Sequence, residues 1–144
     1  MSLFTTVFPK ANAFIYRITN GRLGSRMGKQ SVLLVHTIGR KSGKPYTTPL
    51  SFYRDGGNYL IVGSNWGKEN PPDWFLNLMQ HPQTTIQVKG KTLQVEAYQA
   101  EGEDYQRLWA VVTKKNSQYL EYQKTTTRQI PILILTPESK SEKV

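Results

Sequence analysis

The sequence contains no cysteine, so disulfide bonds, thiolate metal sites and cysteine nucleophiles are all excluded. Its two histidines, His36 and His81, have no second histidine or carboxylate at metal-ligand spacing, so we expect no bound metal. No apolar run reaches the roughly 18 residues that a transmembrane helix requires, and the N-terminus lacks the pattern of a secretory signal. These absences predict a cytoplasmic protein in which any redox chemistry is supplied by a bound cofactor.

Acidic residues are also missing from the first third of the chain. Residues 1–54 contain nine Lys or Arg and no Asp or Glu, whereas residues 55–144 contain ten of each. The whole net charge of +9 therefore comes from the first third, which predicts an anionic partner near that segment. Nucleic acid, anionic lipid and a ligand rich in phosphate or carboxylate groups all fit. A solvated basic face without a partner is the simpler alternative.

One globular domain is expected from the length of 144 residues and the hydrophobic fraction of 38%. Apolar residues recur at helical spacing over residues 3–19, and this amphipathic helix either packs on the domain or lies on an anionic membrane surface. We therefore divide the chain into a helix with a basic connector (residues 1–30), a β-rich domain (31–136) and a loose tail (137–144).

The domain alternates short strands with a few helices. Turn residues separate runs that are either apolar or alternate between apolar and polar residues. The turn at residues 54–58 is typical of a tight hairpin. Antiparallel hairpins dominate, which favours an α+β domain or a small barrel in which strand edges are closed or covered. The expected strands are residues 31–37, 46–53, 59–63, 86–88, 93–97 and 130–136, and the expected helices are 71–80, 103–114 and 117–125.

The turn at residues 39–45 (GRKSGKP) places three cations and one serine around two glycines. Glycine lets backbone N–H groups approach a ligand closely, and the Ser42 hydroxyl adds a further donor. The spacing is not that of a P-loop. The turn is therefore either a phosphate contact of another kind or the tip of a solvated hairpin.

Two further segments are candidates for a ligand pocket. Residues 63–67 (GSNWG) put small polar residues at the end of a strand, and such residues suit the edge of a flat heteroaromatic ring. Trp66 or Trp74 could cover that ring, although Trp74 fits a core position equally well. Further along the chain, Tyr119 and Tyr122 lie one helical turn apart, either over a pocket or packed on the sheet.

Together these segments resemble the deazaflavin-dependent nitroreductase family, which includes the F420H2-dependent quinone reductases. The resemblance implies a split β-barrel of the FMN-binding type, with about six mostly antiparallel strands and flanking helices. It runs from about residue 32 to residue 135, and it rests on these stretches in order: TIGRKSGKP (37–45), TPL (48–50), RDGG (54–57), SN (64–65), Pro71, WFLNL (74–78), HP (81–82), YLEYQ (119–123) and RQIP (128–131).

The resemblance also implies a cofactor and its site. The family binds coenzyme F420, a deazaflavin with a phosphate and an oligoglutamate tail, which is the kind of anionic partner that the basic first third predicts. Ser64, Tyr119 and Tyr122 are the implied catalytic residues, because each can donate a hydrogen bond to charge that develops on the electron acceptor. The implied cofactor-binding residues are Arg40, Lys41, Ser42, Gly43, Lys44, Tyr46, Thr48, Pro49, Leu50, Gly63, Ser64, Asn65, Trp74 and Asn77.

Three positions depart from the pattern of the family. Tyr46 stands where relatives often carry arginine, which removes one expected contact to the tail. Asn65 replaces a residue that is often lysine. Lys115 falls near a position that is aromatic in relatives that activate nitroimidazoles, which makes nitro-drug activation a less expected activity.

The sequence therefore predicts an F420H2-dependent oxidoreductase that passes hydride to a quinone, an enone or a nitro compound. One alternative is an FMN-dependent reductase on the same barrel, and another is a non-catalytic carrier of a flavin, a tetrapyrrole or a lipid. Nucleic-acid binding is disfavoured, because the cations cluster in one turn and one helix while most aromatic residues lie in the expected core or pocket. Open strand edges favour a homodimer, and the helix over residues 3–19 allows peripheral contact with a membrane.

Overall fold

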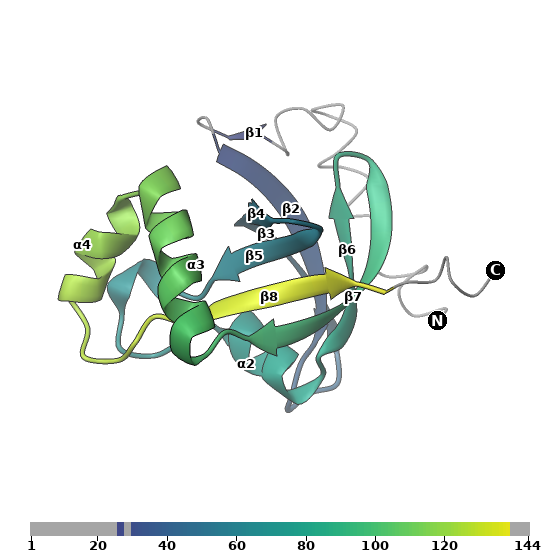
Figure 1. Cartoon of the computed structure of the whole chain (residues 1–144). Coiled ribbons are helices and arrows are strands. Elements are labelled where there is room, and N and C mark those ends of the chain that lie inside the picture. The colour runs from purple at the N-terminus through teal and green to yellow at the C-terminus, as the bar shows by residue number, and fades with distance from the viewer. Residues whose placement is uncertain (1–25, 28–29, 139–144) are drawn as a thin grey trace.

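A computed structural model describes residues 26–27 and 30–138 of the chain (Figure 1). The helix expected over residues 3–19, most of the expected connector and most of the expected tail lie outside the described residues. Within them, no helix is long and apolar enough to cross a membrane.

The described chain contains eight strands, three helices and one short 3-10 turn. Every strand pair is antiparallel, as the hairpin pattern of the sequence predicts. The elements are β1 (Arg26–Met27), β2 (Gln30–Ile38), β3 (Pro45–Ser51), β4 (Tyr53–Asp55), β5 (Asn58–Val62), η1 (Asn65–Gly67), α2 (Asp73–Gln80), β6 (Gln83–Val88), β7 (Lys91–Gln99), α3 (Gly102–Lys115), α4 (Gln118–Lys124) and β8 (Ile132–Pro137).

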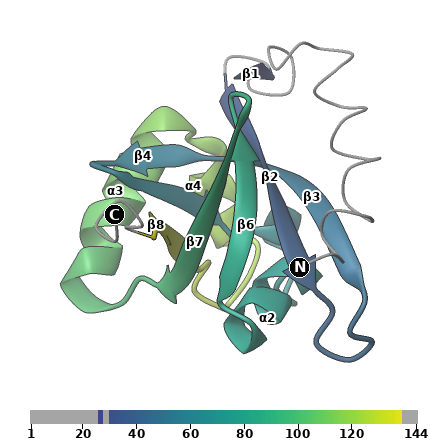
Figure 2. The same cartoon turned by 90° about the vertical axis from the view of Figure 1, so that its right-hand side faces the viewer.

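The sheet is curled into a split barrel. Its strands pair in the order β3-β2-β6-β7-β8-β5-β4, and β1 is added to β2. Strands β3 and β4 lie at opposite ends of this order, yet only Phe52 separates them in the chain. The sheet must therefore bend round until its two ends meet, as Figures 1 and 2 show. This confirms the α+β split barrel that the resemblance implies.

The strand count differs from the expected six for a physical reason. The run over residues 46–53 is divided, because the chain leaves its partner β2 after Ser51 and pairs with β5 from Tyr53 onward. The Phe52 amide still donates a hydrogen bond to the Ser31 carbonyl (3.0 Å), so the transition is a sharp bend in one continuous segment. The two-residue strand β1 has no apolar pattern by which to recognise it.

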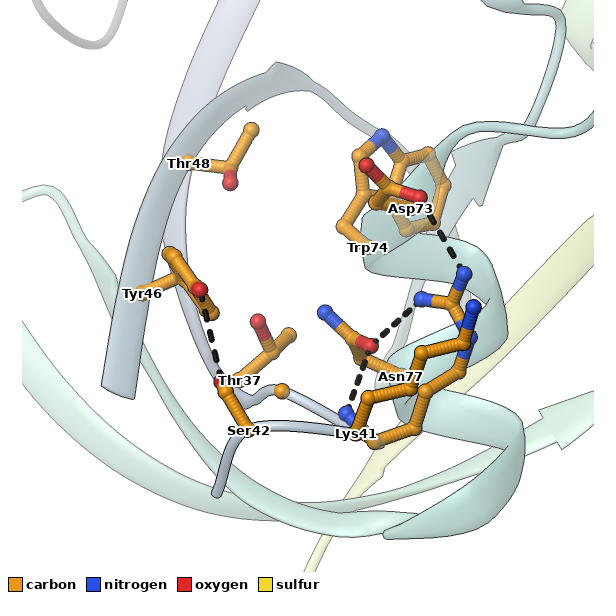
Figure 3. Close-up of a pocket in the computed structure, with 10 residues that line it drawn as sticks. Thr37, Lys41, Ser42, Tyr46, Thr48, Asp73, Trp74 and Asn77 are labelled. Carbon is orange, nitrogen blue, oxygen red and sulfur yellow. Dashed lines mark hydrogen bonds and ion pairs between the residues drawn. The ribbon is translucent and has the colours of Figure 1, made fainter. Parts of the chain in front are cut away.

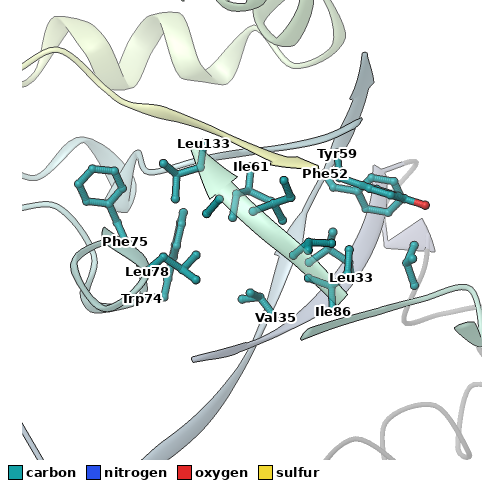
Figure 4. Close-up of a cluster of buried hydrophobic side chains, with 14 residues drawn as sticks. Leu33, Val35, Phe52, Tyr59, Ile61, Trp74, Phe75, Leu78, Ile86 and Leu133 are labelled. Carbon is teal, nitrogen blue, oxygen red and sulfur yellow. The ribbon is translucent and has the colours of Figure 1, made fainter. Parts of the chain in front are cut away.

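The sheet is buried on both faces where β5 and β8 lie. Tyr59 and Ile61 belong to the cluster inside the barrel, whereas Leu60 and Val62 belong to a second cluster that also contains side chains of α3 and α4. Helix α2 closes one end of the interior with Trp74, Phe75 and Leu78 (Figure 4). Burial of alternate residues on both sides explains why these strands read as unbroken apolar runs.

Candidate functional site

Two adjoining hollows form a groove along β3. The first has a volume of about 410 Å³ and lies between the end of β2, the turn at residues 39–45, the start of β3 and α2 (Figure 3). The second has a volume of about 680 Å³ and lies between β3, the loop after β5 and the start of α4. Thr48 and Trp74 line both hollows, so the two are parts of one continuous site. We call them the charged hollow and the neutral hollow, because among the described residues only the first is lined by charged side chains.

The groove brings together most of the residues that the sequence analysis names. Gly43, Lys44 and Gly63 line neither hollow. The charged hollow contains Arg40, Lys41, Ser42, Tyr46, Thr48, Trp74 and Asn77. The neutral hollow contains Thr48, Pro49, Leu50, Ser64, Asn65, Trp74, Tyr119 and Tyr122.

Gly39 and Gly43 determine the backbone conformation of the turn. The Gly39 amide donates to the Lys44 carbonyl (2.8 Å) and the Gly43 amide donates to the Gly39 carbonyl (2.9 Å), which closes the turn. A Cβ atom on Gly39 would lie 2.6 Å from the Ser42 hydroxyl and 2.9 Å from the Tyr46 ring, so a larger residue there would displace both side chains. Gly43 has a positive φ of 75° and open space around it. Its place in the motif is therefore explained by backbone conformation.

Arg40 joins this turn to helix α2. Its backbone N–H and its Nη1 both donate to the Asn77 side-chain oxygen, at 3.0 and 2.8 Å, and its Nη2 forms an ion pair with Asp73 at 3.3 Å (Figure 3). Asp73 and Asn77 are four residues apart and share one face of α2. Lys41 is exposed and forms no ion pair with any described residue, so its charge is available to a ligand of the charged hollow.

Thr37 is a site residue that the sequence analysis missed. It is buried, it lines the charged hollow between Tyr46 and Asn77, and its hydroxyl has no hydrogen-bond partner among the described residues (Figure 3). A buried hydroxyl without a partner costs about 1–3 kcal/mol, which makes Thr37 a candidate contact for a ligand of the charged hollow. Within an apolar β-branched strand, a threonine gives no sequence signal of that role.

The neutral hollow has a different chemistry. None of the described residues that line it carries a charge, whereas the charged hollow contains Arg40, Lys41 and Asp73. Trp66, which the sequence analysis names as a possible cover for a ring, lines the neutral hollow. The other lining residues that the sequence analysis did not name are Gly39 and Asp73 in the charged hollow, and Ser51, Val62, Pro72, Asn116 and Gln118 in the neutral one.

Tyr119 lines the neutral hollow, and its hydroxyl stays protonated at neutral pH. Its oxygen lies 3.0 Å from the Tyr53 hydroxyl oxygen, and its ring is buried. Burial, with the Tyr53 hydroxyl as a second cause, raises the pKa of Tyr119 well above its ordinary value. Tyr119 therefore acts as a hydrogen-bond donor or acceptor at neutral pH, and it does not act as an anion.

Gly63 and Asn65, which were expected to contact the cofactor ring, both stabilise the loop between β5 and α2. A Cβ atom on Gly63 would lie 3.0 Å from the Pro131 ring, so Gly63 permits close packing against that proline. The Asn65 side-chain amide donates to the Asn70 carbonyl (2.7 Å) and closes the loop. Ser64 lines the hollow, and its carbonyl accepts a hydrogen bond from Arg128 (2.9 Å).

Comparisons with known proteins agree with this architecture. A family model described as F420H(2)-dependent quinone reductase matches residues 9–137. An F420H(2)-dependent quinone reductase of Mycobacterium tuberculosis (strain H37Rv) is 44% identical over 126 residues, which cover 85% of each chain. The structure of an F420-H2 dependent reductase is 33% identical, with a TM-score of 0.66, and the match covers 72% of this chain and 92% of that one. A structure described as a domain-swapped dimer is 30% identical, with a TM-score of 0.67, over 87% of this chain and 98% of that one.

Proposed function

Because the chain belongs to the F420H(2)-dependent quinone reductase family, we propose that it is an oxidoreductase that holds reduced coenzyme F420 in the charged hollow and a quinone in the neutral one. The family match supports F420 as the cofactor and gives the FMN alternative no support. It also favours an enzyme over a carrier. The observation that carries the proposal is the division of one groove into a charged part and a neutral aromatic part.

The residues of the charged hollow fit an anionic ligand that bears hydroxyl groups. Among the described residues, Lys41 has no ion-pair partner and the buried Thr37 hydroxyl has no hydrogen-bond partner, and Ser42 lies on the same turn as Lys41. Arg40 adds positive charge but is held by Asn77 and Asp73, so it acts chiefly by fixing the turn. These residues would hold the phosphate region of F420, which supplies a hydride from its reduced ring when it is bound.

The residues of the neutral hollow fit a flat, uncharged electron acceptor. Tyr119 and Tyr122 bring aromatic rings and hydroxyls, and Pro49, Leu50 and Val62 add apolar surface. A Tyr119 O–H that donates to an acceptor oxygen would stabilise negative charge as it develops there, and the Ser64 hydroxyl is a second candidate for that role. Holding the two reactants side by side and excluding water would supply most of the rate. No covalent nucleophile is required.

Enones and nitro compounds are proposed as further acceptors, because they are also flat and electron-poor. A homodimer is proposed as well, since one of the similar structures is described as a domain-swapped dimer. Light scattering coupled to size-exclusion chromatography tests the dimer directly.

The proposed function is tested by binding and then by turnover. Purified protein is titrated with F420 and with FMN while ligand fluorescence is followed, and oxidation of F420H2 is then measured with menadione. We expect tight binding of F420, weak binding of FMN and turnover that depends on both F420H2 and menadione. Preference for FMN, or F420 binding without turnover across quinone, enone and nitro acceptors, would refute the proposal.

A further inference from the structure

Trp66 is a large apolar side chain that the fold exposes at the edge of the neutral hollow. It is 73% exposed, more than any other large hydrophobic residue of the described chain. Its ring meets the Tyr122 ring edge to face, with centroids 6.3 Å apart and planes at 77°. Packing against the described residues leaves most of the indole exposed, so this packing does not explain why a tryptophan stands at the position.

The backbone at Trp66 is in an uncommon conformation. Its φ is 61° and its ψ is 20°, and the preceding Asn65 has a φ of 48°. Both residues are therefore in the left-handed region, which asparagine tolerates and a bulky aromatic residue rarely adopts. The loop therefore holds the Trp66 backbone in a conformation that a tryptophan disfavours.

Contacts on both sides of Trp66 keep the loop in this shape. Arg128 donates from Nη2 to the Ser64 carbonyl and from Nε to the Lys68 carbonyl, both at 2.9 Å. The Thr125 hydroxyl donates to the Gly67 carbonyl at 3.0 Å, and a side chain on Gly67 would collide with Thr125. Strained backbone survives only where its surroundings over-determine it, and such places gather at ligand sites. The segment after α4 thus braces the loop and presents the indole to the hollow.

The chemistry of the hollow indicates what the indole contacts. No charged side chain lines this hollow in the described chain, and Tyr122 and Trp66 form an aromatic corner at its edge. On the basis of the proposed function, we propose that Trp66 is the outer wall of the acceptor site and selects quinones with a fused, two-ring system over single-ring quinones. A second ring adds aromatic contact with the indole, which is favourable beyond the area that it buries.

Steady-state kinetics with two acceptors tests this selectivity. Trp66→Ala and Trp66→Phe are compared with the wild type in F420H2 oxidation, with menadione as the two-ring quinone and 2,6-dimethyl-1,4-benzoquinone as the single-ring one. We expect Trp66→Ala to lower kcat/KM for menadione by about three- to tenfold and to change the single-ring value by less than about twofold. Trp66→Phe should restore most of the loss. Tyr98→Ala, which removes an exposed aromatic ring of β7 outside the lining of either hollow, is the matched control and should change neither value.

A second readout does not depend on turnover. The indole N–H signal of Trp66, assigned from the spectrum of Trp66→Phe, is followed by NMR as menadione is added to the protein without cofactor. We expect a saturable shift of that signal, and its absence would overturn the inference. Equal losses with both quinones, an unchanged menadione value or a weaker affinity of Trp66→Ala for F420 would also overturn it. A wild type that oxidises no F420H2 would refute the proposed function instead, and the NMR titration would still decide whether Trp66 contacts the two-ring quinone.

Discussion

The hydroxyl oxygens of Tyr53 and Tyr119 lie 3.0 Å apart inside the protein. Both tyrosines belong to the cluster that packs the sheet against α3 and α4, and Tyr119 also lines the neutral hollow. A hydroxyl has one hydrogen and two lone pairs. The Tyr53 hydroxyl therefore fixes the orientation of the Tyr119 hydroxyl beside the neutral hollow.

We therefore predict that Tyr53→Phe lowers kcat by about three- to tenfold, the effect of one hydrogen bond, and leaves the KM for F420H2 unchanged. Tyr105→Phe is the matched control, because the Tyr105 hydroxyl is buried in the same cluster and donates to the Ile130 carbonyl at 2.6 Å. It should lose stability but keep kcat. The same substitution at Tyr53 should have no further effect in a Tyr119→Phe background. If Tyr53→Phe and Tyr105→Phe lost kcat equally, the Tyr53 hydroxyl would have only a structural role.

Thr37→Val should separate stability from binding. The buried Thr37 hydroxyl has no partner in the part of the chain that the structure describes, so valine removes an unsatisfied group and should raise the free energy of unfolding by about 1 kcal/mol. The same change should weaken F420 binding by about five- to tenfold, because the hydroxyl is no longer there to meet the ligand. Urea unfolding and fluorescence titration measure the two effects. Thr85→Val is the control: its hydroxyl is bonded to the Gln94 side chain (3.2 Å), so we expect lower stability and unchanged binding.

Lys41→Ala should weaken F420 binding by about tenfold and reduce the dependence of that binding on salt concentration, because a charge-assisted contact with an anion is lost. Lys91→Ala, at the exposed start of β7, removes the same charge away from the groove and should have little effect. Titrations at two salt concentrations measure both quantities. A double variant that also lacks Arg40 is less informative, since Arg40 holds the turn against α2. Identical affinities for the Lys41 and Lys91 variants would place the anionic part of the ligand elsewhere.

The strain at Trp66 predicts an ordering of stabilities. Trp66→Gly and Trp66→Ala both lose the indole, but only glycine adopts a φ of 61° without penalty. The glycine variant should therefore be more stable than the alanine variant by about 1 kcal/mol in urea unfolding. An alanine variant that matches or exceeds the glycine variant would mean that the backbone is not strained.

His36 predicts a loss of stability in mild acid. Its ring is buried between Thr47 and Gln87, and burial lowers its pKa from 6.5 to about 4, although the hydrogen bond with Gln87 opposes this. The pKa of the folded state is therefore below that of the unfolded state. The stabilisation is complete above about pH 6.5 and is lost as the pH falls toward about 4. Urea midpoints of the wild type should decline across that interval, and those of His36→Gln should not. A parallel decline in both proteins would assign the effect to other groups.

Much of the fold follows from local pattern. The strand boundaries near residues 31–37 and 59–63 are visible because β-branched and aromatic runs end at glycines, and the hairpin at Gly56 and Gly57 is a local signal. The division of β3 from β4 at Phe52 is not visible, because it depends on which strand each half meets after the barrel has curled.

The candidate site shows the same limit. The motif around Arg40 is easily found, but its contacts with Asp73 and Asn77 join residues 33 and 37 positions apart and exist only in the folded chain. They show that Arg40 also fixes the turn against α2, while its expected contact with a ligand stays a prediction. The left-handed backbone of Trp66 and the unpartnered hydroxyl of Thr37 are also properties of tertiary packing, so residue types alone do not reveal them.

The central claim is that the two parts of one groove hold the cofactor and the acceptor at the same time. Initial rates measured over a grid of F420H2 and menadione concentrations test it most directly. Simultaneous occupancy predicts double-reciprocal lines that intersect, as expected for a complex that contains both reactants. Parallel lines would mean that the reactants bind in turn, and that result would contradict the assignment of the charged and neutral hollows to separate ligands.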